Sequence, residues 1–298
     1  MRNLIRSVLF FILVILLGSS TGVKAGDFYE VEALYEINIV HDISFAEGKD
    51  FDAYLPVATS KEQKFPAIVM IHGGGWVAGT KRQAREVRNG KVLASRGYVC
   101  VDIEYLIAKE DAPSWPQCLY DCKNAVKYLR KYADKYNVDA DRIAVMGGSA
   151  GGHLALMTAF TGGNHRYKSG LYDEYSDDVS AVIDLYGITN TLKWRYKGGY
   201  MLLGHTKKGN EELWKEASPV FAVKSEMPAI LIMHGTDDKT VGIEQSQELS
   251  DVLEQKGIEH ELIVVEGAGH SFTFDSTPTN YWPVILEFLK DNLRNNNG

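Results

Sequence analysis

The chain has 298 residues, of which 45% are hydrophobic and 24% charged, and its formal net charge is −7. This composition is typical of a globular protein with a substantial core, and it excludes collagen-like, low-complexity and repeat architectures. The negative charge argues against nucleic acid or an anionic membrane as a partner, because both would repel the chain.

Residues 1–25 have the features of a secretory signal peptide. Arg2 and Arg6 accompany an unbroken apolar run at 8–17, and the small residues Val23 and Ala25 stand at the usual cleavage positions. A membrane anchor is the alternative, but a bilayer-spanning helix needs about 20 apolar residues. We therefore expect secretion or export to the periplasm, with no stable membrane insertion after cleavage. Loss of this segment would change the net charge from −7 to −10.

Apolar runs and amphipathic stretches alternate along the rest of the chain. A continuous apolar run such as 67–71 suits a strand that is buried on both faces of a sheet. We expect an early antiparallel pair of strands and then a mostly parallel α/β sheet with helices on both faces, in one domain at 26–298. The predicted strands are 35–44, 51–55, 67–71, 98–105, 142–146, 179–185, 229–233 and 261–265, and the predicted helices are 115–136, 153–160, 244–256 and 282–294.

Residues 189–223 form a longer connection that carries Trp194, Tyr196, Tyr200 and Trp214. Two interpretations of this segment stay open. It is either a pair of surface helices without a role in function or a wall or partial lid over the active site.

The three cysteines, Cys100, Cys118 and Cys122, leave at least one thiol outside any internal disulfide. A bridge between Cys118 and Cys122 would be poor in geometry on one helix, whereas a bridge from Cys100 stays open. The favoured interpretation is three small buried hydrophobic residues.

The motif G-x-S-x-G at 147–151 lies between a predicted strand and a predicted helix. A tight strand-to-helix turn of this kind lifts the central serine above the sheet edge. It also places the serine at a helix N-terminus, whose dipole favours the negative charge that develops in catalysis. We therefore expect Ser149 to be a nucleophile.

Three consecutive glycines follow the predicted strand 67–71, in the sequence HGGGW at 72–76. Their cost in backbone entropy suggests a purpose, which would be to expose N–H groups toward a bound oxyanion. The candidate oxyanion hole consists of the N–H groups of Gly74, Gly75 and Ala150. His72 is expected to organise this loop.

An acid and a base follow the next predicted strands. Asp238 ends the sequence HGTDD at 234–238, and His270 lies in EGAGHSF at 266–272. The order serine, aspartate, histidine is that of an α/β-hydrolase triad, and each candidate lies at the carboxyl end of a strand, where open parallel sheets bind ligands. Order alone leaves Asp237 as an alternative acid. His153 and His234 are expected to be structural, and the candidate substrate-binding aromatics are Trp76 and Tyr186.

These four motifs together resemble the hormone-sensitive-lipase-like branch of the α/β hydrolases. More narrowly, the chain is similar to bacterial secreted acetyl xylan and feruloyl esterases over essentially its whole mature length. The resemblance implies an α/β-hydrolase fold with a small or absent cap. It also favours Asp238 over Asp237, because the family's acid is the second of the two. One departure is Gly242, which stands where the family usually has a proline.

The expected function is that of a serine carboxylesterase that removes acetyl or feruloyl groups from plant cell-wall polysaccharide or its oligosaccharides. An amide hydrolase of the formamidase or exopeptidase kind is the first alternative, since the same triad serves both bonds. A catalytically inactive binding module is the second, although no triad member is missing. No metal or organic cofactor is expected, because serine chemistry needs none. The acyl group, the polysaccharide and the oligomeric state are left open.

Overall fold

The computed structural model describes residues 31–275 and 279–293. In this part of the chain the strands are β1 Ile37–Ala46, β2 Lys49–Pro56, β3 Phe65–Ile71, β4 Val99–Ile103, β5 Val138–Gly148, β6 Ala181–Leu185, β7 Ala229–Gly235 and β8 Glu261–Val265. The α-helices are α1 Ala84–Ser95, α2 Gln117–Lys131, α3 Ala150–Phe160, α4 Lys197–Leu203, α5 Glu211–Glu216, α6 Pro219–Ala222, α7 Glu244–Gln255 and α8 Trp282–Asn292. Short 3₁₀ helices lie at η1 Ala133–Tyr136, η2 His165–Tyr167 and η3 Thr191–Lys193.

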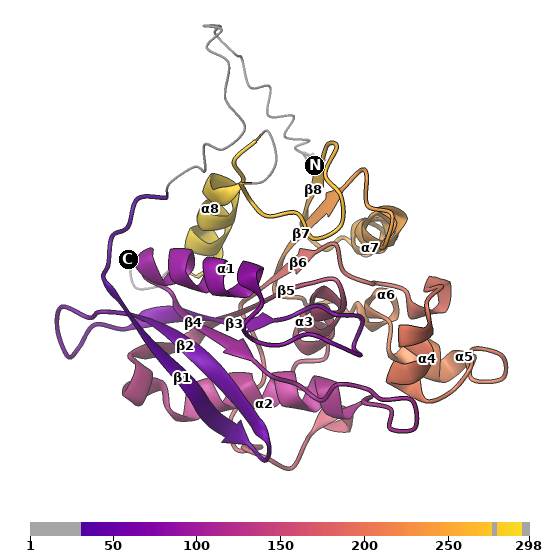
Figure 1. Ribbon diagram of the computed structural model, residues 1–298, viewed down its shortest axis with the longest axis horizontal. Helices are drawn as coiled ribbons and strands as arrows, with labels where there is room; N and C mark the ends of the chain where they lie inside the picture. The colour runs from indigo at the N-terminus through magenta and orange to yellow at the C-terminus, as the bar shows by residue number, and fades with distance from the viewer. Residues whose placement is uncertain (1–30, 276–278, 294–298) are drawn as a thin grey trace, which may run out of the picture.

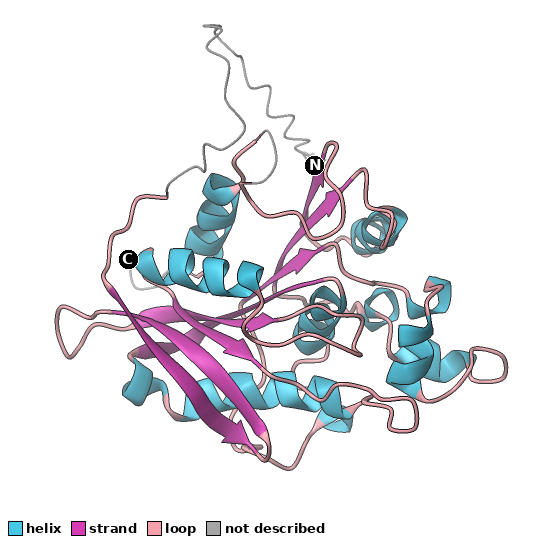
Figure 2. Ribbon diagram, viewed as in Figure 1, coloured by secondary structure: helices cyan, strands magenta, loops and turns pink. Residues whose placement is uncertain are grey.

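The strands form one sheet in the order β1-β2-β4-β3-β5-β6-β7-β8. β1 pairs antiparallel with β2, and β2 pairs antiparallel with β4. Every later pairing, from β4–β3 to β7–β8, is parallel. Figure 2 shows the helices on both faces of this sheet. The predicted mostly parallel sheet, with an antiparallel pair at its start, is confirmed.

Two apolar layers cover the two faces of the sheet. Along β3 the residues alternate between them, as the two-residue period of a strand requires: Val69 and Ile71 pack with one layer, Ile68 and Met70 with the other. Helices α2, α3 and α7 contribute to the first layer, and α1 and α8 to the second. Figure 1 shows α1 and α2 on opposite sides of the sheet. Burial on both faces explains why the parallel strands read as continuous apolar runs.

The predicted helices at 153–160 and 244–256 correspond to α3 and α7, with α3 starting three residues earlier than expected. Helix α1 was not predicted, because Asn89 and Gly90 weaken its helical propensity. The close approach of Tyr54 explains the glycine, since a Cβ at Gly90 would lie 2.6 Å from the Tyr54 ring. Packing against the sheet therefore stabilises a helix that its own sequence supports poorly.

Cys100, Cys118 and Cys122 are all buried free thiols, which confirms the favoured interpretation. Burial raises the pKa of the Cys118 thiol to about 12, so it stays protonated. The predicted signal peptide at 1–25 lies outside the described residues. Within the residues that the structure does describe, none of the helices combines the length and apolar character needed to cross a bilayer.

Candidate active site

Ser149 lies in the tight turn between β5 and α3, with φ 59° and ψ −123°. This left-handed backbone is strained for a residue with a side chain, and it occurs where the surrounding structure imposes it. Gly147 is required here, since a Cβ at this position would lie 2.2 Å from the carbonyl oxygen of Gly151. The Ser149 N–H donates to Leu185 O at 2.9 Å, which ties the turn to the end of β6. The residue is 9% exposed, so its neighbours cover most of it.

A chain of hydrogen bonds connects Ser149, His270 and Asp238. The Ser149 Oγ lies 3.0 Å from His270 Nε2, and His270 Nδ1 lies 2.6 Å from Asp238 Oδ2. The second carboxylate oxygen, Oδ1, accepts from the N–H groups of Thr240 at 2.8 Å and Val241 at 2.9 Å. The structure therefore brings the three predicted residues together. This geometry allows His270 to take a proton from the serine while Asp238 holds the imidazole ring.

The Asp238 carboxylate also faces a second, fully buried histidine. His234 Nε2 donates to Val241 O at 2.8 Å and lies 3.3 Å from Asp238 Oδ2. Its Nδ1 accepts from the Ser246 hydroxyl at 2.7 Å. Burial alone would raise the pKa of Asp238, but its bonds from His234, His270 and the Val241 N–H outweigh burial and hold that pKa well below its ordinary value. The carboxylate is therefore held in its ionised form beside His270.

Asp237, the alternative acid, is exposed, and the carboxylate that His270 contacts is that of Asp238. Its own N–H donates to Ala268 O at 2.9 Å, which fixes the backbone of the loop. His153 lies outside hydrogen-bond contact with Ser149 Oγ, as expected for a structural residue. The geometry thus supports Asp238, and not Asp237, as the acid of the triad.

The loop after β3, residues 72–82, lies directly against the nucleophile; we call it the oxyanion loop. A Cβ at Gly73 would be 3.5 Å from Ser149 Cβ. Gly74 has φ 118°, and a Cβ there would be 2.0 Å from Ala78 O, so no other residue fits. Among the described residues, the N–H groups of Gly74, Gly75 and Ala150, the first residue of α3, donate no hydrogen bond to another group. These three N–H groups therefore remain the candidate donors to an oxyanion that develops at Ser149.

Buried side chains hold the middle and the start of the oxyanion loop. Trp76 is fully buried, and its indole N–H donates to His153 Nδ1 at 3.1 Å, while His153 Nε2 donates to Ala217 O at 2.7 Å. Burial lowers the pKa of His153 to about 4, so this relay is neutral. His72 stacks on Tyr105 with ring centroids 4.3 Å apart, in line with its expected organising role.

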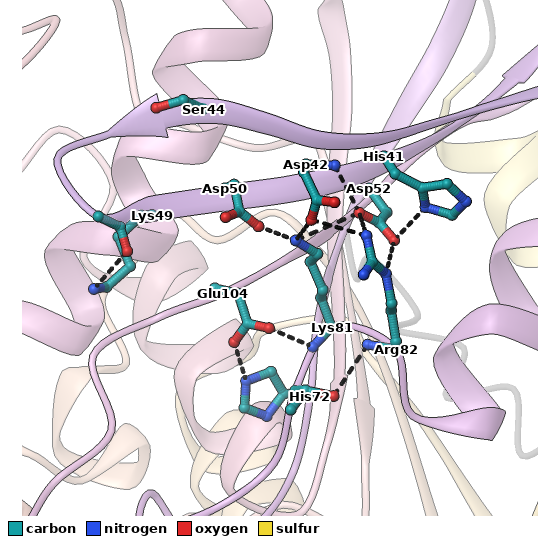
Figure 3. A network of polar contacts seen from close by, with 12 residues as sticks. His41, Asp42, Ser44, Lys49, Asp50, Asp52, His72, Lys81, Arg82 and Glu104 are labelled. Carbon is teal, nitrogen blue, oxygen red and sulfur yellow. Dashed lines mark hydrogen bonds and ion pairs between the residues drawn. The ribbon is translucent and has the colours of Figure 1, made fainter.

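A network of ion pairs holds the far end of the oxyanion loop to the antiparallel pair β1–β2 (Figure 3). The Lys81 ammonium lies 2.6 Å from Asp42 Oδ1 and 3.4 Å from Asp52 Oδ1, and it also contacts Asp50. The Lys81 backbone N–H donates to Glu104 Oε1 at 3.1 Å. The Lys81 side chain is only 5% exposed, whereas the side chains of Asp42 and Asp50 are 59% and 38% exposed.

Arg82 extends the same network. Its Nε lies 2.6 Å from Asp52 Oδ2 and its Nη2 3.1 Å from Asp52 Oδ1, a bidentate pair with a buried carboxylate. The Arg82 Nη2 also reaches Asp42 Oδ1 at 2.8 Å, and His41 Nδ1 lies 2.7 Å from Asp52 Oδ2. Asp42 has φ 55° at an irregularity in β1, which turns its carboxylate toward Lys81 and Arg82 (Figure 3).

The two candidate substrate-binding aromatics are both buried. Trp76 and Tyr186 are each 0% exposed, so neither presents a side-chain surface to a substrate, and their burial gives no support to direct contact. Tyr186 packs edge-on against the His270 ring at 4.9 Å, and its hydroxyl accepts from Arg85. Both residues thus act on the site through their neighbours, Trp76 on the oxyanion loop and Tyr186 on the catalytic imidazole.

Sequence reasoning missed the network of Lys81, Arg82, Asp42 and Asp52. The available signal was the basic pair Lys81 and Arg82 after the glycines, together with the alternating acids Asp50 and Asp52 on a strand. Charged residues in such patterns usually lie on solvated faces. The pairing of β1 with β2 brings the acids together, and the order β2-β4-β3 brings the loop after β3 to them. Within the described residues, no group of three or more His, Cys, Asp or Glu side chains could hold a metal ion.

Comparison with known proteins gives a consistent assignment. The profile of the BD-FAE family matches residues 51–253. The esterase LipC of Mycobacterium tuberculosis is 28% identical over 262 residues, which are 80% of this chain and 62% of LipC. The chain therefore spans less than two thirds of the length of that relative.

Two solved structures have the same fold. A truncated carbohydrate esterase from gut microbiota is 25% identical, with a TM-score of 0.76 over 88% of this chain and 98% of its own. Esterase 2 of Thermogutta terrifontis is 25% identical, with a TM-score of 0.65 over 86% of this chain and 91% of its own. These similarities identify the α/β-hydrolase fold.

Proposed function

Since the chain belongs to the BD-FAE family, we propose that it is a secreted or periplasmic serine carboxylesterase. Its substrates are acetyl or feruloyl esters borne by plant cell-wall polysaccharide or by oligosaccharides released from it. The observation that carries the proposal is the hydrogen-bonded chain from Ser149 Oγ through His270 to Asp238, with distances of 3.0 and 2.6 Å. The oxyanion loop lies against the same serine.

In the first half of the reaction the Ser149 oxygen attacks the ester carbonyl while His270 Nε2 takes the serine proton. The negative charge passes to the former carbonyl oxygen, where the N–H groups of Gly74, Gly75 and Ala150 receive it. Asp238 stabilises the imidazolium, and His270 then gives its proton to the departing sugar oxygen. The products of this half are the free sugar hydroxyl and an acyl-serine.

Water completes the cycle by the same route. His270 takes a proton from a water molecule, the resulting hydroxide attacks the acyl-serine, and the second tetrahedral charge lies in the same oxyanion hole. Collapse breaks the bond to Ser149 Oγ, which recovers its proton from His270. The free carboxylic acid leaves, and no metal or organic cofactor takes part.

Two further parts of the proposal, the sugar-borne ester and the location outside the cytoplasm, are each supported by a different observation. The similarity to a carbohydrate esterase over 88% of the chain supports an ester on a carbohydrate. The basic residues and apolar run of 1–25 support export from the cytoplasm. The small or absent cap that the resemblance implies would suit an ester attached to a polymer.

The direct test compares the wild-type protein with Ser149→Ala on four substrates: p-nitrophenyl acetate, methyl ferulate, acetylated xylan and an amino-acid anilide. We expect the wild type to release acetate or ferulate, and the variant to lose at least about 10⁴-fold in kcat because no other nucleophile is in place. The profile over the first three substrates identifies the acyl group. Cleavage of the anilide with the esters untouched would replace the proposal with an amide hydrolase.

A further inference from the structure

Two loops at the carboxyl edge of the sheet enclose a pocket of about 250 Å³. One loop follows β6 and η3 and contributes Trp194, Arg195 and Tyr196. The other follows β7 and contributes Lys239, Thr240 and Glu244, together with Asp238 itself. We call this space the aromatic pocket. No step of the ester cleavage described above uses it.

The aromatic pocket borders the mouth of the active site. On one side, the Trp194 ring meets the Trp76 ring edge-on at 5.9 Å, and a Cβ at Gly198 would lie 2.6 Å from Gly75 O. On the other side, the Tyr196 hydroxyl donates to Lys239 O at 3.5 Å, next to the acid Asp238. The segment 194–198 thus touches both the oxyanion loop and the acid loop.

Tyr196 offers an aromatic face to solvent at this position. It is 54% exposed, whereas its neighbour Trp194 is buried and packs against it with ring centroids 5.0 Å apart. A tyrosine held in this way loses little conformational entropy on binding, and it has an apolar face beside a polar hydroxyl. These are the properties that suit stacking against the C–H face of a sugar ring.

The charged side chains around the aromatic pocket can form hydrogen bonds with a ligand that carries many hydroxyl groups. Arg195 and Lys239 are exposed, and neither forms an ion pair among the described residues. Glu244 supplies a carboxylate to the same wall. The neighbouring lysines, by contrast, already form ion pairs: Lys193 with Glu248 at 2.9 Å and Lys197 with Glu110 at 2.6 Å. Desolvating the unpaired groups against an alkyl chain would be costly, whereas sugar hydroxyls can hydrogen-bond to both signs of charge.

We propose that the aromatic pocket is a subsite for a neutral sugar ring of the chain that bears the ester. The ring stacks on Tyr196, and Arg195, Lys239 and Glu244 hydrogen-bond to its hydroxyls. This assignment rests on the proposed function, and it names Tyr196 as the aromatic residue that contacts the substrate. Of the two interpretations of the segment 189–223, the proposal favours a wall of the active site, formed by residues 194–198.

The first experiment measures Tyr196→Ala on acetylated xylo-oligosaccharide and on p-nitrophenyl acetate, which has no sugar. We expect kcat/KM on the oligosaccharide to fall about tenfold, mainly through KM, because stacking on an aromatic side chain contributes about that much. Hydrolysis of p-nitrophenyl acetate should stay within about twofold. Tyr196→Phe keeps the ring and should retain most of the oligosaccharide activity.

Tyr200→Ala is the matched control, since Tyr200 is an exposed tyrosine on α4 that does not line the pocket. It should change neither substrate. An equal loss on both substrates in Tyr196→Ala, or no loss on either, would overturn the subsite. Thermal unfolding of each variant separates a loss of folding from a loss of sugar contact.

The second experiment separates the subsite from the reaction. Unesterified xylohexaose is titrated into two proteins, the Ser149→Ala variant and the double variant Ser149→Ala with Tyr196→Ala. Calorimetry measures binding in both, and tryptophan fluorescence is the second readout. Binding that the second substitution removes supports the subsite even if the wild type cleaves no sugar ester, a result that would contradict the proposed function alone. Cleavage of acetylated oligosaccharide with unchanged xylohexaose binding in the double variant would leave the proposed function intact and reject the subsite.

Discussion

The triad and the oxyanion loop face each other across the nucleophile, and they are held by different kinds of contact. Ser149, Asp238 and His270 each follow a strand of the same parallel sheet, and short turns fix them near its edge. The oxyanion loop runs from β3 to α1 without regular structure. Its position depends on the Trp76–His153 bond in the middle and on the Lys81 and Arg82 ion pairs at its end.

This difference indicates where the site tolerates change. A parallel sheet aligns the carboxyl ends of its strands by backbone pairing, so the triad needs few side chains to position it. A loop of three glycines has no such support, and its donors must be ordered before the reaction to stabilise charge in the transition state. We therefore expect substitutions in the triad to affect chemistry directly, and those around the loop to affect stability and kcat together.

The largest effect is expected for Asp238→Asn. The amide cannot hold the catalytic tautomer of His270, so kcat should fall by about 10³–10⁴-fold with little change in KM. Asp237→Asn is the matched control and should stay within about twofold, because the exposed Asp237 side chain lies outside the chain of bonds. Steady-state kinetics on p-nitrophenyl acetate measures both. Equal losses in the two variants would contradict the assignment of the acid.

The His153 relay should make the stability of the protein depend on pH. Burial lowers the pKa of His153 from 6.5 to about 4, so between these values the unfolded chain binds a proton that the folded protein does not. The contribution of neutral His153 is complete above pH 6.5 and declines as the pH falls toward 4. The free energy of unfolding should decrease over this window by roughly 3 kcal/mol from this group.

Urea unfolding at several pH values, compared between wild type and His153→Gln, measures that slope. The variant should be less stable at neutral pH, because it removes the buried ring that bridges Trp76 and Ala217, and its slope between pH 6.5 and 4 should be flatter. His205→Gln replaces an exposed histidine and should leave the slope unchanged. An identical slope in wild type and His153→Gln would show that the relay does not titrate as described.

The smallest effect is expected for Lys81→Met, which removes the central cation of the network. Asp50 then loses its cation, while Asp42 and Asp52 keep Arg82, so we expect a loss of roughly 1–2 kcal/mol in stability. The loosened oxyanion loop should lower kcat by about tenfold at unchanged KM. Lys64→Met breaks the more exposed pair with Asp134, far from the loop, and should leave kcat unchanged. Loss of stability without a change in kcat would mean that the network supports the fold alone.

The sequence by itself determined the parallel sheet, the order of the triad and the glycine motif of the oxyanion loop. Each of these depends on local patterns: apolar runs mark strands buried on two faces, and a serine between glycines marks a strand-to-helix turn. The choice between Asp237 and Asp238 needed the resemblance to a family, since adjacent residues share the same local pattern. Geometry supports it, because only Asp238 points toward His270.

The tertiary structure decided what depends on contacts between distant segments. Helix α1 carries Gly90 in its interior because Tyr54 packs against that position, a contact that no local pattern specifies. Trp76 and Tyr186 are buried because the layers of the fold close over them, whereas Tyr196 stays 54% exposed. The ion pairs of Lys81 and Arg82 join residues about 30 to 40 positions apart, and no local pattern specifies such pairing. Burial and partner choice are properties of the packed chain, so they become visible only when the sheet has assembled.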